Sequence, residues 1–458
     1  MVLFLIRLNS CFGVNVWCIV IVMVDVWLPY GKTDVCIRVP ARNLLGSIVP
    51  VQKSSVSDSK AEIERALKEP IGASRLSEIV AAAKPESKVA LLVDDVACKS
   101  PDEFTVLSVL SELNLAGVKD ENVTIILGCN VNSSYTSGVV VKPEDYVTFL
   151  GAEVLSRVKV VTHDAAAKDL VYVGTTKSHG NKVFLNSLFA EADIKILLSD
   201  VNVHYYAGYS GGGKSVVSGV SGVETIRHNS VLMLNSAARA GVLDGNPVSE
   251  DLLEVARMAK VDFVVNLVRN SKGEIVKVFA GDLEAAFLEA VKLVDEIYKV
   301  SVDRRADIVV VSAGGYPVDV TLYQAYKAVD NVLDVVKRGG VIVLVAECSK
   351  GHGNQVFYDW MARLTDFKST EKEIKRNFAM GGHKAYCLLK VLQNHPIILV
   401  SSLPDYYATN VFKLKTARAV NDALTEAFKL AGSASRVWVV PAGSHTLPEY
   451  KSPEETKT

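Results

Sequence analysis

The chain has 458 residues, enough for two or three domains with large buried cores. Its 50 Lys and Arg residues nearly balance 51 Asp and Glu residues, and the formal charge of −1 gives no electrostatic argument for a nucleic-acid partner. The seven cysteines contain no Cys-x-x-Cys pair, which argues against a zinc ribbon or disulfide framework and is typical of the reducing cytoplasm.

The first 25 residues are unusually apolar, with residues 16–24 as the densest part, and residues 1–22 are interpreted as an N-terminal extension. This run is much shorter than the roughly 20 residues of a membrane-spanning helix, and the segment has no clear cleavage site of a signal peptide. A start codon assigned too early explains it better than a targeting signal. We therefore expect a cytoplasmic protein without a membrane partner.

Short apolar runs in the first half of the chain predict buried strands at residues 89–93, 123–127, 159–162, 194–199 and 263–267. The apolar spacing of residues 104–115 predicts a helix between two of these strands. Alternation of strands and helices is typical of a largely parallel sheet with helices on both faces.

Polar motifs follow four of the predicted strands: Asp94-Asp95, Gly128-Cys129-Asn130, Thr162-His163-Asp164, and the stretch from Asn202 to Lys214. Ligands of parallel sheets bind beyond the carboxyl ends of the strands. The four motifs together therefore predict a ligand site at this edge of the sheet.

The last of these motifs carries the most chemistry, because His204 is followed by a glycine-rich loop and then by Lys214. The glycines are Gly208, Gly211, Gly212 and Gly213. Glycine allows close approach of the backbone to a ligand and offers N–H groups to phosphate. Lysine can pair with phosphate or act as an amine nucleophile, and histidine is a base near neutral pH.

Residues Gly208 to Ser215 also satisfy the Walker A pattern of nucleotide hydrolases. That motif needs a helix that starts at the Lys-Ser pair and points its N-terminus at the phosphates. Gly219, Gly222 and several β-branched valines follow at once, so we expect no stable helix there. A second apolar strand that ends in an acidic Mg²⁺ ligand is also not evident.

The second half of the chain repeats the alternation. An amphipathic helix is expected over residues 281–300, and strands over 307–312, 340–345, 397–401 and 436–440. We expect an α/β fold with two α/β domains whose mainly parallel sheets face a central cleft. Their expected boundaries are a cofactor-binding domain at 23–285, a connecting helix at 286–300, a C-terminal domain at 301–448 and a polar tail at 449–458.

The pattern His204-x3-Gly208-Tyr-Ser-Gly-Gly-x-Lys214 resembles the nickel-pincer lactate racemase family. Other motifs of that family follow in the same order, from about Met23 to about Pro448. They include Leu28-Pro-Tyr-Gly31, Gly174-Thr-Thr176, Glu224-Thr-Ile226, Gly314-Gly-Tyr-Pro-Val-Asp319 and Gly382-His-Lys384.

The resemblance implies a small hydroxy-acid substrate and a nickel-pincer nucleotide, a pyridinium mononucleotide linked to Lys214 in which two sulfurs and one carbon hold nickel. His204 then matches one of two histidine bases, and Asp95 and the four glycines match cofactor-binding positions. Tyr323, Gln324 and Lys327 match substrate-binding positions, where a lysine suits a carboxylate. Proteins that synthesise the cofactor are implied as partners.

Three positions depart from the family's pattern. Its second histidine base falls on Asn130, which is left as a substrate-binding residue because asparagine cannot exchange protons near neutral pH. A family arginine falls on Cys98, and the nickel-ligating histidine falls on Ser230. His228, two residues away, is the candidate metal ligand in its place.

The leading hypothesis is a racemase or epimerase of a 2-hydroxy acid other than lactate, such as a sugar acid. The alternatives are a binding protein of the same fold without turnover and, third, a nucleotide hydrolase. Individual residues also have plainer interpretations: Lys214 as a simple phosphate anchor, His204 as a structural histidine, and Tyr323 and Gln324 as packing at a helix start.

Overall fold

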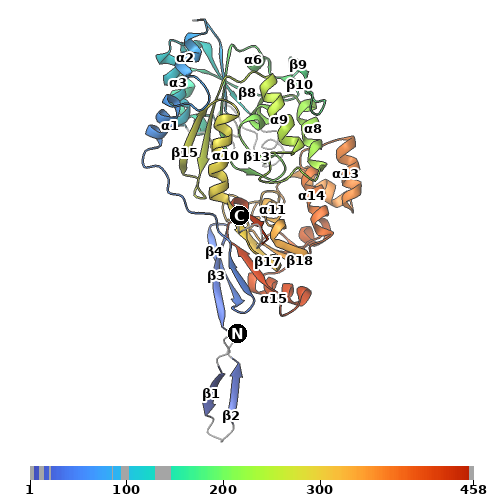
Figure 1. Ribbon diagram of the computed structural model, residues 1–458. Coiled ribbons are helices and arrows are strands. Elements are labelled where there is room, and N and C mark those ends of the chain that lie inside the picture. Colours follow the sequence, from blue (N-terminus) through green and yellow to red (C-terminus); the bar gives the residue numbers. More distant parts are fainter. Residues whose placement is uncertain are drawn as a thin grey trace. The chain divides into compact units, whose positions relative to one another are not determined.

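The computed structural model describes residues 5–9, 15–19, 22–84, 86–93, 103–128 and 146–452. Two compact units make up the chain (Figure 1). Unit 1 comprises Met1–Val49, Val300–Gly353 and Cys387–Thr458, and unit 2 comprises Pro50–Lys299 and Asn354–Tyr386. Of the residues singled out in the sequence, Asp94, Asp95, Cys98, Cys129 and Asn130 lie outside the described part.

Unit 2 contains a six-stranded sheet with the order β15-β14-β11-β6-β7-β8. Its strands are β6 (Val89–Val93), β7 (Val123–Leu127), β8 (Lys159–Thr162), β11 (Ile194–Asp200), β14 (Phe263–Arg269) and β15 (Ile275–Gly281). Neighbouring strands are parallel except for the antiparallel pair β14–β15. All five strands predicted for this half of the chain are confirmed.

Helices cover both faces of this sheet (Figure 1). One face shares a hydrophobic core with α1 (Ser59–Lys68), α2 (Leu76–Ala81), α3 (Glu103–Leu115) and α5 (Tyr146–Arg157). The opposite face packs against α7 (Gly213–Val220) and α10 (Ala285–Tyr298). Along β6, Leu91 belongs to the first core, whereas the next residue, Leu92, lies against Gly219 of α7. This alternation is the two-residue period of a strand.

Unit 1 contains a second six-stranded sheet, in which every neighbouring pair is parallel and the order is β20-β19-β18-β17-β21-β5. The strands are β5 (Leu44–Ser47), β17 (Ala306–Ser312), β18 (Val336–Val345), β19 (Ile397–Val400), β20 (Lys415–Thr416) and β21 (Val437–Val440). One core joins this sheet, helix α15 (Val420–Ala431) and the hairpin of β3 (Met23–Tyr30) and β4 (Thr33–Pro40). The expected α/β class with mainly parallel sheets is confirmed.

Two segments lie in a different unit from the one expected from the sequence. Residues 23–49 lie in unit 1, because β5 pairs with β21 and the β3–β4 hairpin enters that unit's core. Residues 354–386 lie in unit 2. They contain α12 (Gln355–Arg363), α13 (Phe367–Arg376) and the first five residues of α14 (Gly382–Leu392). Long-range pairings of this kind leave no local signal in the sequence.

Within residues 1–22, β1 (Leu5–Asn9) and β2 (Asn15–Ile19) form an antiparallel pair. Across the described ranges, every helix is too short or too polar to cross a bilayer. The remaining short elements are β9 (Val171–Thr175), β10 (Lys182–Leu185), α6 (Ser187–Ala190), α8 (Val223–Val231), α9 (Pro247–Met258), α11 (Leu322–Asn331), β16 (Lys299–Val302) and β22 (Leu447–Tyr450).

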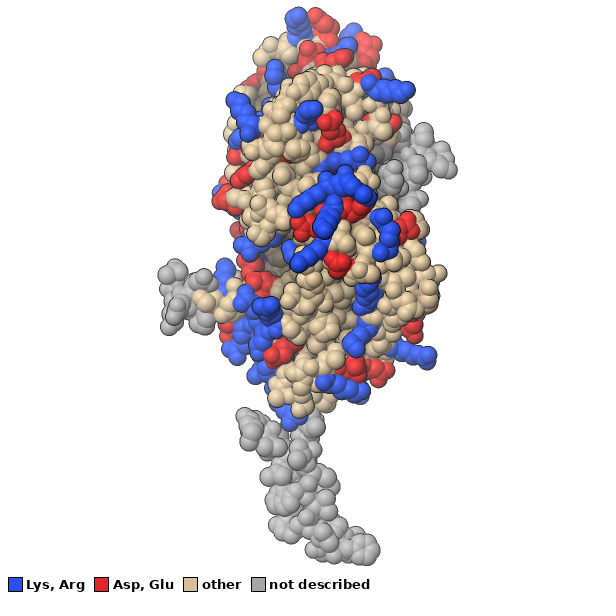
Figure 2. Space-filling model, turned by 90° about the vertical axis from the view of Figure 1, so that its right-hand side faces the viewer, with Lys and Arg blue, Asp and Glu red and all other residues tan. Residues whose placement is uncertain are grey.

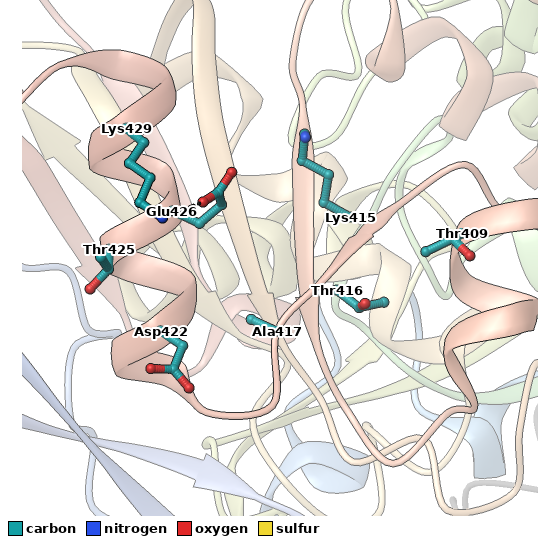
Figure 3. Close-up of a pocket in the computed structure, with 8 residues that line it drawn as sticks. All are labelled: Thr409, Lys415, Thr416, Ala417, Asp422, Thr425, Glu426 and Lys429. Carbon is teal, nitrogen blue, oxygen red and sulfur yellow. Dashed lines mark ion pairs between the residues drawn. The ribbon is translucent and has the colours of Figure 1, made fainter.

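Acidic and basic side chains are interspersed on the face shown in Figure 2, as expected for the nearly neutral net charge. In unit 1, a groove of about 530 Å³ runs between α15 and the segment Lys415–Ala417 (Figure 3). Apart from Ala417, its lining side chains are threonines or charged residues, and Glu426 pairs with Lys429 along the helix at 3.2 Å. None of the candidate site residues lines this groove.

Candidate active site

A short hairpin connects strand β11 to helix α7 and carries the histidine and the lysine of the central motif. The chain leaves β11 at Asp200, pairs β12 (Val203–His204) with β13 (Gly208–Tyr209), and enters α7 at Gly213. Ser210 closes the hairpin: its N–H donates to Asn202 O at 2.8 Å, and its Oγ accepts from Asn202 N–H at 3.0 Å. His204 and Lys214 therefore belong to one hydrogen-bonded unit beyond the carboxyl end of β11.

The expectation that no stable helix follows the glycine loop is wrong, because α7 begins at Gly213. Val216, Val217 and Val220 are buried, and packing against α9 and the sheet outweighs their weak helix propensity. The N–H groups of Lys214 and Ser215 donate to Gly211 O and Gly212 O at 3.2 and 3.1 Å. In a P-loop, such N–H groups point at phosphate instead. The geometry therefore still argues against the nucleotide hydrolase, although for a different reason.

The four glycines of the loop pack closely against neighbouring protein atoms. A Cβ at each of them would collide with a neighbour: Val242 O for Gly208, Val201 Cγ2 for Gly211, the Phe287 ring for Gly212 and Leu252 O for Gly213. Three of them also have positive φ values, +78°, +79° and +52° for Gly208, Gly211 and Gly212. Close packing of the loop therefore requires these glycines, and Gly211 and Gly213 also line the larger cavity beside Lys214.

Helix α10 anchors the loop through Tyr209. The Tyr209 hydroxyl donates to Asp295 Oδ1 at 2.5 Å, and Lys299 Nζ pairs with the other oxygen of the same carboxylate at 3.0 Å. Lys299 also lies over the Tyr209 ring, 5.7 Å from its centroid, and donates to Gly241 O at 2.9 Å. Because Asp295 and Lys299 are only partly exposed, this network fixes the loop more firmly than a surface ion pair would.

Lys214 lies on the first turn of α7 and lines two cavities. Within the described residues its Nζ has one hydrogen bond, a long one of 3.5 Å to Ser218 Oγ. The smaller cavity, about 30 Å³, is also lined by Ser218, Asn229, Ser230 and Met380. The larger one, about 290 Å³, is bounded by the loop, Ser249, Glu250 and Phe287. A volume near 300 Å³ is at the lower end of the range for small-molecule sites, so the amine has a ligand-sized space beside it.

His204 is half-buried, and its hydrogen bonding defines its neutral form. Its Nδ1 accepts the N–H of Ala207 at 3.2 Å, so the neutral ring carries its proton on Nε2. Its ring stacks on Tyr205 with centroids 4.8 Å apart and meets the edge of Tyr206 at 4.6 Å. In this state Nε2–H can donate a proton to a substrate oxygen. Accepting a proton at Nε2 requires the ring first to release the Ala207 contact.

A buried carboxylate that the sequence did not indicate holds one wall of the smaller cavity. Asp251 of α9 has no exposed surface and accepts from Thr176 Oγ1, Asn181 Nδ2 and Asn229 Nδ2 at 2.9, 2.8 and 2.9 Å. Asn229, on α8, lines the cavity beside Lys214. The network gives Thr176, the last residue of the motif Gly174-Thr-Thr176, a structural role as a hydrogen-bond donor to Asp251. In the sequence, Asp251 looks like any polar residue of an amphipathic helix.

The predicted substrate-binding residues of the second half lie in unit 1, on helix α11. Lys327 lies four residues after Tyr323 and three after Gln324, so it neighbours both on the helix surface. Tyr323 is buried, whereas exposed Gln324 accepts from the hydroxyl of Thr321, the residue that caps the helix, at 2.9 Å. Gln324 therefore has a helix-capping role in this structure. The other predicted residues, Asp95 and Asn130, lie outside the described residues.

Comparison with known proteins decides the family. The lactate racemase N-terminal domain matches residues 30–241, and the lactate racemase C-terminal domain matches residues 301–447. The chain belongs to the lactate racemase family. It is 30% identical over 440 residues to lactate racemase of Thermoanaerobacterium thermosaccharolyticum, covering 94% of this chain and 100% of that one. It is 28% identical to lactate racemase of Lactiplantibacillus plantarum, covering 92% and 99% of the two chains.

Solved structures agree with this family. The lactate racemase apoprotein from Thermoanaerobacterium thermosaccharolyticum matches with a TM-score of 0.84 and 29% identity, over 93% of this chain and 100% of that one. A protein from Thermotoga maritima matches with a TM-score of 0.61 and 18% identity, over 88% and 100% of the two chains. The second match supports the fold alone.

His228, the predicted metal ligand, does not face the cavity that Lys214 lines. His228 Nε2 donates to the backbone carbonyl of His179 at 2.8 Å. Residues two apart on a helix face different sides, and on α8 it is Ser230 that lines the cavity with Lys214. The described residues also contain no group of three His, Cys, Asp or Glu side chains placed to hold a metal ion. The assignment of His228 as metal ligand therefore does not fit the structure.

We expect Gly212→Ala to destabilise the protein by about 2 to 4 kcal/mol, because left-handed strain of about 1 to 2 kcal/mol adds to overpacking against Phe287. A Cβ there would lie 2.8 Å from the ring. Gly273→Ala is the matched control, since Gly273 has φ +81° but nothing within 4 Å of the added Cβ. Urea unfolding of both variants measures the difference. Equal losses would contradict the packing role of the loop glycine.

Proposed function

We propose that the protein is a racemase or epimerase of a small 2-hydroxy acid other than lactate, such as a sugar acid, and that it uses a nickel-pincer nucleotide attached to Lys214. One observation carries the proposal: the loop that presents His204 also places the Lys214 amine beside a cavity of about 290 Å³. Membership of the lactate racemase family supports the same reaction class. We also propose that the protein works in the cytoplasm and that cofactor-synthesis proteins are its partners.

The residues of the chain would divide the work as follows. Lys214 holds the nucleotide covalently, and its weak hydrogen bond to Ser218 leaves the amine available for that link. The cofactor, when bound, supplies a ring that takes hydride from the substrate carbon and returns it. His204 exchanges the proton of the substrate hydroxyl at Nε2. Lys327 and Tyr323 on α11 bind the substrate's carboxylate and hydroxyl groups.

Two substitutions favour a substrate other than lactate. The second proton-exchanging position of the family carries Asn130, whose amide can donate and accept hydrogen bonds but cannot take a proton. Ser230 provides only a hydroxyl to the cavity at the position of the nickel-ligating histidine. A substrate with further hydroxyl groups would give Asn130 and Ser230 hydrogen-bonding partners, which lactate cannot offer.

The same substitutions favour the second candidate, a protein of this fold that binds the nucleotide or a hydroxy acid without turnover. The two candidates differ in an observable way, because only the enzyme changes the configuration of its ligand. The nucleotide hydrolase, third in order, requires ATP hydrolysis. The arrangement of the α7 N-terminus gives no reason to expect it.

We expect the protein, produced together with cofactor-synthesis proteins, to epimerise at least one non-lactate 2-hydroxy acid in a panel followed by chiral chromatography. His204→Gln should lower the rate by about 10² to 10⁴-fold, the usual contribution of a general acid or base. His228→Gln is the matched control and should keep both activity and nickel content, because His228 bonds to the His179 carbonyl. Binding without any change of configuration across the panel would favour the non-catalytic protein instead.

Lactate racemisation by the unmodified protein should be weak. Asn130→His together with Ser230→His should raise it by about 10² to 10⁴-fold, because the change restores an acid–base group. Rates for D- and L-lactate should rise together, since each direction uses both proton-exchanging groups. Ser230→Ala serves as the control that alters the cavity without adding an imidazole. Interconversion of lactate by the unmodified protein at ordinary enzyme rates would contradict this account of the substitutions.

A further inference from the structure

His383 is a buried histidine of unit 2 that the proposed reaction does not use directly. It has 1% of its surface exposed and lies at the start of α14, within the motif Gly382-His-Lys384. The N–H of Gly381 donates to its Nδ1 at 3.2 Å, so the neutral ring carries its proton on Nε2. That Nε2–H donates to the Tyr205 hydroxyl oxygen at 2.5 Å. The backbone therefore fixes which tautomer of His383 meets Tyr205.

Tyr205 connects His383 to the candidate catalytic histidine by ring stacking. The rings of His383 and Tyr205 are stacked at 6.0 Å with an interplanar angle of 18°, and those of Tyr205 and His204 at 4.8 Å with 25°. On the far side, Phe378 stacks on His383 at 5.9 Å and 18°. Lys384 Nζ lies 5.5 Å from the centroid of the Tyr205 ring. Four rings in sequence, from Phe378 to His204, thus lie nearly parallel.

The surroundings of His383 make it a constant hydrogen-bond donor. Burial, together with the charge of Lys384, lowers the pKa of His383 to about 3, so the ring stays neutral and keeps its Nε2 proton at ordinary pH. The two glycines before it are required by packing, since a Cβ on Gly382 would lie 2.6 Å from the Trp360 ring. Residues 354–386 belong to unit 2 although they are far along the chain from its main segment. The hydrogen bond between His383 and Tyr205 joins them to the loop of Lys214.

We infer that His383 is a positioning residue for His204: by holding Tyr205 it keeps the His204 ring in the plane in which Nδ1 accepts the Ala207 N–H, and so keeps the proton on Nε2. His204 lies on a strand of two residues and is half-buried, and its Ala207 contact is long at 3.2 Å, so a stacked neighbour that is itself held in place adds to the restraint on the ring. A fixed ring plane directs Nε2 to one substrate position, and small displacements of a reacting group cost large factors in rate. The inference rests on the proposed function only for its effect on turnover.

Nuclear magnetic resonance of the ring nitrogens of His204 tests the inference in the full-length protein without cofactor. The unmodified protein should show His204 mainly protonated on Nε2. Tyr205→Phe keeps the stacked ring and removes the acceptor of His383, and His383→Leu removes the donor; both should convert His204 to a mixture of tautomers. His383→Gln keeps an N–H donor and should restore much of the original form.

His163→Gln is the matched control, because His163 is equally buried in unit 2 but bonds to Ser221 O and Asn186. It should leave the His204 signals unchanged. An unchanged tautomer population in Tyr205→Phe and His383→Leu would overturn the inference. If His383→Leu fails to fold, Tyr205→Phe alone decides.

In the cofactor-loaded enzyme, kcat should fall about tenfold in Tyr205→Phe and His383→Leu, with KM changed less than about twofold, as expected for a loss of orientation rather than of binding. A larger effect on KM than on kcat would contradict a positioning role. Should the loaded parent protein show no turnover, the proposed reaction fails, whereas the tautomer measurement still decides the role of His383.

Discussion

The packing of the glycine loop is the constraint on which the site depends. Backbone carbonyls of residues 242 and 252 and the ring of Phe287 occupy the space that side chains on the loop would need. The loop therefore has one path from β11 to α7, and the Tyr209–Asp295–Lys299 network holds it there. Because the path is fixed, the lysine on the first turn of α7 and the histidine of the preceding hairpin have fixed positions as well. The loop backbone therefore positions the two side chains to which the proposed chemistry is assigned.

The sheets could be predicted from the sequence because buried parallel strands are short, continuous apolar runs. Val89–Val93 and Val123–Leu127 were predicted with the bounds that the structure gives to β6 and β7. Helix α7 could not be predicted, since its glycines and valines have low helix propensity and only burial against α9 and the sheet stabilises it. The assignment of separate chain segments to one unit could not be predicted from the sequence either, because it depends on long-range strand pairings such as β5 with β21.

In the site too, residues of a local motif could be recognised in the sequence, whereas contacts between residues far apart in the chain could not. His204 and Lys214 are candidates in the sequence because their motif is local. The Asp251 network and the contact of His383 with Tyr205 join residues 22 to 178 positions apart, so no spacing in the sequence indicates them. The position of His228 relative to Ser230, in contrast, follows from local geometry. Once α8 is taken as a helix, residues 228 and 230 must face different sides.

The Lys214 amine, and not the backbone of the loop, is the proposed point of attachment of the cofactor. Peptide mass mapping of the protein purified after production with cofactor-synthesis proteins locates the added mass. It should be found on the peptide that contains Lys214, and fragmentation should assign it to this residue. Nucleotide that is released intact on denaturation, or a covalent adduct on another residue, would contradict attachment at Lys214.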